Sequence, residues 1–351
     1  MWAMVIKEFR ELKRDRRTMG MLIGLPIVLL VIFGYAANFS VDSVSTALVG
    51  SGSDAVAQQL PAFFDVVEID PTGTPDDATD DLVDNRANAA IVIGDGAPQL
   101  LVDGSSLFTA QATVAAAQRA GDGLTVDVLF NPDLKTSWVM VPGLIGLIMT
   151  FIGTIVTSLG LVRERADGTL EQLAVMPFRP SDVIAGKIAP YFALAYLDMV
   201  AVTVLGALLF GVPFNGSVLL FGIGAAIFLL VVLGLGVLIS TISENQGQAI
   251  QTAMFIVMPQ ILLSGMIFPL SSMPWGVRWI GYLLPLTYFI EISTGILLRG
   301  AGIGSLWYAY AILIVMAVVV FGGAVLRFRR DLAPRLRSTP ARSTDQATAA
   351  P

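Results

Sequence analysis

Apolar residues gather in long runs along this chain, and several runs are long enough to cross a membrane. A spanning helix needs about 20 apolar residues to cross about 30 Å of hydrocarbon. Runs of this kind, with few or no charges, lie at residues 18–38, 138–162, 188–212, 217–242, 249–268 and 305–326. The pattern predicts an all-α polytopic membrane protein with six transmembrane helices.

A further apolar stretch at residues 271–300 is interrupted by Pro274, Pro285 and several glycines. Neither half is long enough to cross, so we expect two short helices that form a re-entrant hairpin in the outer leaflet. Such a hairpin needs protein around it, because exposed backbone polar groups are costly in lipid. A seventh crossing is the alternative, and it would place the C-terminus outside the cell.

The first run follows a short amphipathic pattern. In residues 1–17, apolar side chains recur at helical spacing and basic side chains occupy much of the remainder, which is typical of a helix on the cytoplasmic face of a bilayer. The basic start also resembles a secretory signal. Because the run at 18–38 is long and lacks a clear small-residue cleavage pattern, we interpret it as an uncleaved anchor.

The segment 39–136 has a different pattern. Helix-like stretches at 75–86 and 105–120 alternate with strand-like stretches, which predicts a small inserted α/β domain. The strand-like stretches lie at 46–50, 65–69, 89–93, 99–102 and 125–129. The segment carries 15 Asp and Glu against three Lys and Arg, a local net charge of -12.

Composition and charge agree with this organisation and orient it. The chain is 55% hydrophobic and 14% charged, with a mean hydropathy of +0.76. Of its 21 Lys and Arg, 16 lie in 1–17, in 163–187 or after 326, all on one side if there are six spans. Positive residues favour the cytoplasmic side. We therefore expect cytoplasmic termini, an extracytoplasmic α/β domain, a transmembrane domain over 137–330 and a disordered cytoplasmic tail at 331–351.

The chain contains neither histidine nor cysteine. This excludes haem or zinc ligation by histidine, histidine-dependent hydrolysis, thiolate catalysis and iron–sulfur clusters. We expect no catalytic residues and no metal site.

The basic loop at 163–187 carries the most information about function. Gly168 breaks the chain, Thr169 can cap a new helix, and Gln172 completes a capping box. A short helix over 169–176 would end before Pro177 and could dock a partner protein. From the residues alone, a plain surface turn is an equally good interpretation.

This loop, RERADGTLEQLAVMPFRPSDVIAGK from Arg163, resembles that of permease subunits of ABC transporters of the type 2 exporter class. There an R-E-R-x-x-G-T-L-E-Q-L run precedes a proline and a Gly-Lys pair. The stretch FPLSSMPWGVRWIGYLLPLTYFIEISTGILLRG resembles the family's outer re-entrant region through its M-P-x-W and P-L-T-Y elements. Leu284 departs from the pattern, since many members carry Asn there, and we expect little consequence. The resemblance covers nearly the whole chain.

The resemblance implies a dimer of permeases, of two copies or two related chains, in which each permease binds an ATP-hydrolysing subunit. The implied coupling residues are Arg163, Glu164, Arg165, Gly168, Thr169, Leu170, Glu171, Gln172 and Leu173. The chain has no G-x-x-x-x-G-K-[ST] loop, because its one Gly-Lys pair, at Gly186, precedes Ile188. We expect a transport subunit rather than an enzyme, binding no cofactor directly and using ATP hydrolysed by its partner.

A bacterial plasma membrane is the expected location, since eukaryotic signals are absent. Membrane lipid completes the expected partners, and no nucleic acid is among them. Family members export hydrophobic drugs, antibiotics, lipids, polysaccharides or sodium, and the apolar spans favour a hydrophobic cargo.

Three charged residues, Asp198, Arg278 and Glu291, are candidates for a substrate pathway or gate, since a charge in the bilayer costs about 2.5–3.5 kcal/mol unless it is hydrated or paired. Asp198 lies eleven residues after Lys187, about 16 Å into its span. It could line the pathway, pair across the dimer or satisfy a neighbouring span. Glu291, with Arg278 and Arg299 nearby in sequence, could form an outer ion pair that closes the exit.

Two other functions remain possible. An ion-coupled secondary transporter could use Asp198, although no inverted repeat is apparent. A membrane protein that does not transport could use its outer domain as a sensor or binding module.

Overall fold

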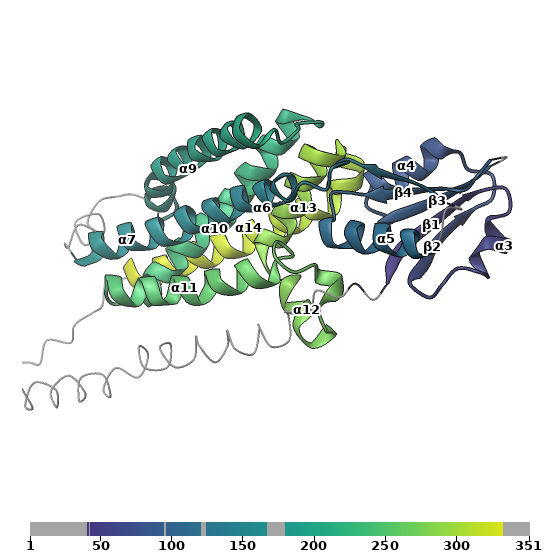
Figure 1. Cartoon of the computed structure of the whole chain (residues 1–351). Coiled ribbons are helices and arrows are strands. Elements are labelled where there is room, and N and C mark those ends of the chain that lie inside the picture. The colour runs from purple at the N-terminus through teal and green to yellow at the C-terminus, as the bar shows by residue number, and fades with distance from the viewer. Residues whose placement is uncertain (1–40, 42, 95, 121–123, 167–179, 333–351) are drawn as a thin grey trace, which may run out of the picture.

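The computed structural model of the 351-residue chain describes residues 41, 43–94, 96–120, 124–166 and 180–332. These residues form a five-stranded α/β domain and a helical bundle, and the domain packs on one end of the bundle (Figure 1). The predictions for residues 1–17, 18–38 and 169–176, and for nearly all of 331–351, lie outside the described residues.

The sheet of the α/β domain has the strand order β2-β1-β3-β4-β5. Its strands are β1 (Val44–Gly50), β2 (Phe64–Asp70), β3 (Ala89–Ile93), β4 (Gln99–Asp103) and β5 (Thr125–Leu129). Neighbouring strands run parallel except for β3 and β4, which are antiparallel. The five predicted strands are confirmed to within two residues at each end.

Helices cover both faces of this sheet. Successive residues of a strand point to opposite faces, and Leu48 packs in the same apolar cluster as Ala110 of α5 (Leu107–Ala120). Its neighbour Ala47 packs with Leu82 of α4 (Pro75–Val83) on the other face. A five-residue helix, α3 (Ser53–Ala57), follows β1. The predicted α/β domain is therefore confirmed as a layered unit.

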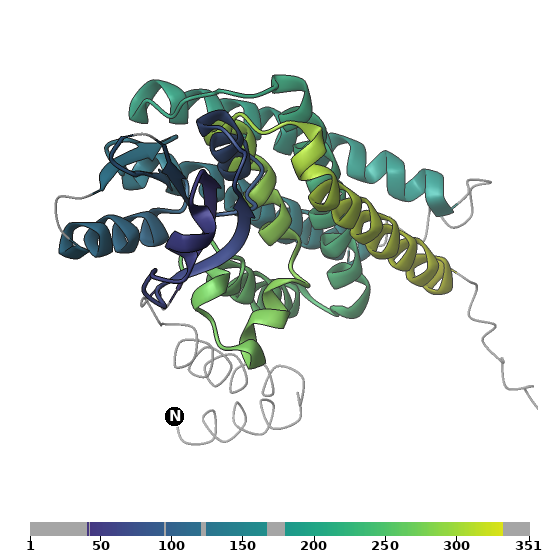
Figure 2. The same cartoon turned by 90° about the vertical axis from the view of Figure 1, so that its right-hand side faces the viewer.

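The bundle begins with one continuous helical segment, which is made of α6 (Thr136–Phe151), the π-helical turn η1 (Ile152–Val156) and α7 (Thr157–Ala166). Its other long helices are α9 (Pro180–Phe210), α10 (Val218–Ile242), α11 (Gln246–Leu263) and α14 (Ile303–Leu332). Helix α10 lies at the centre, in contact with α14, α7, η1 and α13. Helix α9 runs along the outside (Figure 2) and exposes many of its leucines, as a lipid-facing helix does.

Four described helices are long and apolar enough to cross a membrane, namely Thr136–Glu164, Ile188–Phe210, Val218–Ile242 and Ile303–Arg327. They correspond to four of the six predicted spans. The run at 249–268 differs from its prediction, because α11 ends at Leu263 and the chain turns at Gly265, where φ is +91°. Helix α11 also carries four glutamines and is not among the four.

The stretch at 271–300 contains two short helices, after the 3-10 turn η2 (Leu270–Ser272). Helix α12 (Trp275–Gly281) is followed by α13 (Pro285–Thr294), which continues as the π-helical turn η3 (Gly295–Arg299). The two halves are bent by 76°. Each half is shorter than the roughly 20 residues that a crossing needs, as the sequence predicts.

Candidate functional site

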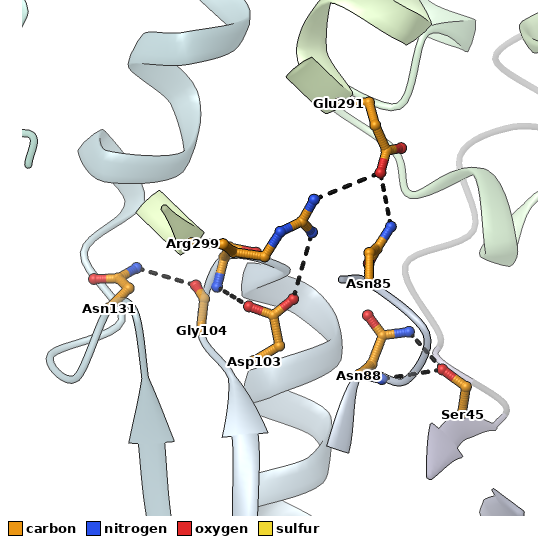
Figure 3. A network of polar contacts seen from close by, with 9 residues as sticks. Ser45, Asn85, Asn88, Asp103, Gly104, Asn131, Glu291 and Arg299 are labelled. Carbon is orange, nitrogen blue, oxygen red and sulfur yellow. Dashed lines mark hydrogen bonds and ion pairs between the residues drawn. The ribbon is translucent and has the colours of Figure 1, made fainter. Parts of the chain in front are cut away.

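Three charged side chains meet where the α/β domain joins the bundle. Arg299, the last residue of η3, lies with Nη1 3.8 Å from Oδ2 of Asp103 and Nη2 3.5 Å from Oε1 of Glu291. Asp103 ends β4, and Glu291 lies on α13. Figure 3 shows the guanidinium between the two carboxylates. We call Asp103, Glu291 and Arg299 the junction triad. The side chains of Asp103 and Arg299 are 0% and 5% exposed.

The backbone of η3 places Arg299. Gly300 ends this π-helical turn with φ +69°, a left-handed conformation that glycine adopts at little cost, and the N–H of Ala301 donates to the carbonyl of Gly295. A Cβ on Gly295 would lie only 3.2 Å from Nη2 of Arg299. Gly295 therefore leaves room for the guanidinium.

The end of β4 places Asp103. Its Oδ1 accepts a 2.8 Å hydrogen bond from the N–H of Ser105. At Gly104 between them, a Cβ would lie 2.8 Å from the carbonyl oxygen of Leu129. This close passage against the end of β5 directs the carboxylate of Asp103 toward the bundle.

Two asparagines strengthen the junction. Nδ2 of Asn85, just after α4, donates to Oε1 of Glu291 over 2.8 Å. Nδ2 of the fully buried Asn131 donates to the carbonyls of Gly104 and Lys135, and its Oδ1 accepts from the N–H of Lys135. Asn131 thereby fixes the chain between β5 and α6. The domain is held to the bundle from both sides of the triad.

Burial raises the pKa of the Asp103 carboxyl, and the Arg299 guanidinium acts in the opposite direction. Taking charges out of water costs several kcal/mol per ion, roughly, and attraction between them recovers this only with good geometry. The hydrogen bond from the backbone N–H of Ser105 also lowers the pKa of Asp103. The charged groups of the junction are therefore buried, and each is stabilised by its charged and hydrogen-bonding neighbours.

The structure separates the predicted gate residues. Glu291 pairs with Arg299 and not with Arg278, whose Nε donates to the carbonyl of Met273 over 3.1 Å and whose Nη2 donates to that of Ser271. Arg278 thus closes the turn before α12. Asp198 lies on α9 with Oδ2 buried and without a hydrogen-bond partner among the described residues.

The predicted coupling residues lie elsewhere. Arg163 is exposed and Glu164 half-buried near the end of α7, and Arg165 follows on the same helix. Figure 1 places this end of α7 opposite the α/β domain. Gly168, Thr169, Leu170, Glu171, Gln172 and Leu173 lie outside the described residues.

Sequence reasoning missed Asp103, Asn85 and Asn131. A weak signal was present, because an acidic residue followed by glycine ends the otherwise apolar strand QLLVD. Among the described residues no group of three or more His, Cys, Asp or Glu could hold a metal ion.

The sequence matches known transporter proteins over most of its length. The family described as "ABC-2 family transporter protein" matches residues 16–326. The "Probable multidrug ABC transporter permease YbhS" of Escherichia coli (strain K12) is 31% identical over 373 residues, which cover 94% of this chain and 97% of that protein. The "Probable multidrug ABC transporter permease YbhR" of the same strain is 30% identical over 364 residues, with 95% and 99% covered. The "ABC transporter G family member 20" of Dictyostelium discoideum is 28% identical over 200 residues, 56% of this chain and 27% of that protein.

Proposed function

The chain belongs to the ABC-2 transporter family, and on that basis we propose that it moves its substrate outward with energy from a separate ATPase subunit that docks on loop 163–187. Membership makes the chain a membrane permease of an ABC exporter. The observation that carries the proposal is the family match over 16–326. The position of Arg163 and Glu164 at the end of the bundle away from the α/β domain supports it (Figure 1).

In this proposal the chain has six spans in a bacterial plasma membrane. The run at 18–38 and α11 join the four long apolar helices, and α12 with α13 forms a re-entrant hairpin. The basic segments lie in the cytoplasm with both termini, and the acidic α/β domain lies outside. Because α7 and α14 end away from that domain, this orientation agrees with the described geometry (Figure 1).

Energy would enter through α7. When ATP brings two ATPase subunits together, the coupling loops held by them move, and each loop moves the end of its α7. Helix α7 contacts α10 and α11, so its displacement reaches the centre of the bundle. The π-helical turn η1 is the natural place for α7 to bend relative to α6, since such turns are often found at functional sites.

The partners and cargo follow the same reasoning. A second permease copy, identical or related, and membrane lipid would cover the exposed apolar helix surfaces. Two of the relatives are named multidrug permeases, and the strongly apolar helices of this chain suit a hydrophobic drug, antibiotic or lipid. ATP would be bound by the ATPase subunit and not by this chain.

The test is reconstitution with a candidate ABC ATPase subunit of the same organism. We expect the two proteins to purify together, and we expect Glu164→Ala to lower transport-coupled ATPase activity without loss of membrane insertion. Glu68→Ala, an exposed glutamate in the α/β domain, is the matched control and should have no effect. Transport without any ATPase would instead support an ion-coupled transporter, and a complex without substrate flux would support a sensor.

A further inference from the structure

A cavity of about 260 Å³ lies beside the junction triad. Its wall combines residues of the α/β domain, of α6, of the turn after α11 and of α13. At about 30 Å³ per water molecule, this volume equals about nine waters, or an organic group of about a dozen non-hydrogen atoms. The cavity is therefore large enough for a small ligand or for one end of a longer one.

Three donor groups in the cavity wall have no hydrogen-bond partner among the described residues. They are Oγ of Ser105, Oγ of Ser264 and Nε of Arg299, all buried. Ser264 is 1% exposed and Arg299 7%. A buried polar group without a partner is costly. A ligand with oxygen acceptors would satisfy these donors, of which Ser264 and Arg299 belong to the bundle.

The remaining wall sets the charge and polarity of that ligand. The charged residues that line the cavity are Glu291 and Arg299, which already pair with each other. Anions are further disfavoured by the net charge of -12 on segment 39–136. Met140, Met266 and Leu270 add flexible apolar surface. A neutral molecule with an apolar body and an oxygen acceptor fits these conditions.

We propose that this cavity is a binding site for a neutral amphiphile, whose carbonyl, ester or ether oxygen accepts hydrogen bonds from Ser264 and Arg299. Its apolar part lies against the methionines and Leu270. Binding there bridges the α/β domain and the bundle, since both contribute to the wall. The site goes beyond the proposed transport function, because equilibrium binding requires no ATPase.

Four probes that share a phenylalkyl body test the chemistry. They are 4-phenylbutan-2-one, butylbenzene, 4-phenylbutan-2-amine and 4-phenylbutanoate, which carry a carbonyl, no polar group, an ammonium and a carboxylate. Equilibrium dialysis against the full-length permease in phosphatidylcholine nanodiscs, with protein-free discs subtracted, gives each affinity. We expect the ketone to bind at least about fivefold more tightly than the other three, as one or two hydrogen bonds allow.

The variant Ser264→Ala then tests whether the ketone binds in this cavity. This variant should weaken the ketone at least about fivefold and leave butylbenzene unchanged. Ser240→Ala is the matched control, since Ser240 is a buried serine of α10 that does not line the cavity. It should leave both affinities unchanged.

Three results would overturn the site. One is the absence of saturable binding by any probe, which would mean that the cavity holds only water. The second is tightest binding by the ammonium or the carboxylate, and the third is an equal effect of Ser264→Ala on ketone and hydrocarbon. The wild-type series decides the first two even if Ser264→Ala does not fold. Failure of the ATPase to purify with the permease would contradict the proposed function and leave these affinities unaffected.

Discussion

The junction triad and the crossing of α10 over η1 hold the molecule together by different means. At the junction, Arg299 and two carboxylates meet with asparagines in directional contacts. At the crossing, backbone meets backbone, because a Cβ on Gly236 would lie 2.8 Å from the carbonyl oxygen of Gly153 and 2.9 Å from Cβ of Thr157.

The difference follows from the surroundings of each region. The junction lies at the end of the bundle that carries the acidic α/β domain, where charged side chains can specify one docking geometry. The crossing lies between apolar helices, where lipid provides no hydrophobic force to hold helices together and small residues allow close packing. We therefore expect the junction to be sensitive to loss of a charge partner and the crossing to be sensitive to added volume.

The largest effect is expected from Arg299→Met. It leaves the carboxylate of Asp103 buried without its cation, which should lower the free energy of unfolding by about 3–5 kcal/mol. Chemical denaturation of the permease in nanodiscs measures this loss. The double variant Arg299→Met with Asp103→Leu should recover part of the stability, because an apolar replacement of a buried ion pair is often tolerated. No loss in the single variant would mean that the triad does not hold the domain.

The next largest effect is expected at the crossing. Gly236→Ala places a methyl group against the backbone of η1 and should cost about 1–3 kcal/mol. Gly322→Ala is the matched control, since no atom lies within 4 Å of a Cβ added to this glycine of α14. Thermal unfolding of the two variants side by side checks the prediction. Equal unfolding temperatures would contradict close backbone packing at Gly236.

The smallest effect concerns pH at the junction. Because burial raises the native pKa of Asp103, its contribution to stability is fully present below its ordinary pKa and is lost as pH rises through the native value. Asp103→Asn does not titrate at this position. The wild type should therefore lose stability relative to this variant as pH rises above about 4, where an unperturbed aspartate titrates. If the wild type instead gained stability relative to Asp103→Asn as pH rises, the native pKa of Asp103 would be lowered and not raised.

Much of the fold could be predicted because local sequence patterns determine its helices and strands. The strands of the α/β domain follow from short apolar runs, and the two short helices of 271–300 follow from Pro274 and Pro285. The end of α11 could not be predicted from its apolar run. That run continues through Phe268, whereas the helix ends at Leu263 and Gly265 turns in a left-handed conformation.

Only part of the junction triad could be predicted from the sequence. Glu291 and Arg299 lie eight residues apart, and the sequence indicates their pairing as one of two alternatives. Asp103 is almost two hundred residues away from both, and Asn85 is 206 residues from Glu291. Such contacts depend on how the α/β domain docks, which no local pattern encodes. Arg278 shows the converse. It is close to Glu291 in sequence, but its guanidinium donates hydrogen bonds to the carbonyls of the turn before α12.

Docking of an ATPase subunit at the α7 end of the bundle can be tested directly. The chain contains no cysteine, so a single introduced cysteine reports one position. Arg163→Cys on α7 and Glu68→Cys on β2 lie at exposed positions, on elements at opposite ends of the described structure. Each variant would be treated with a short bis-maleimide in the presence of the candidate ATPase subunit carrying a surface cysteine. A permease–ATPase cross-link from Arg163→Cys alone is predicted, and a cross-link from Glu68→Cys alone, or from neither, would contradict the account.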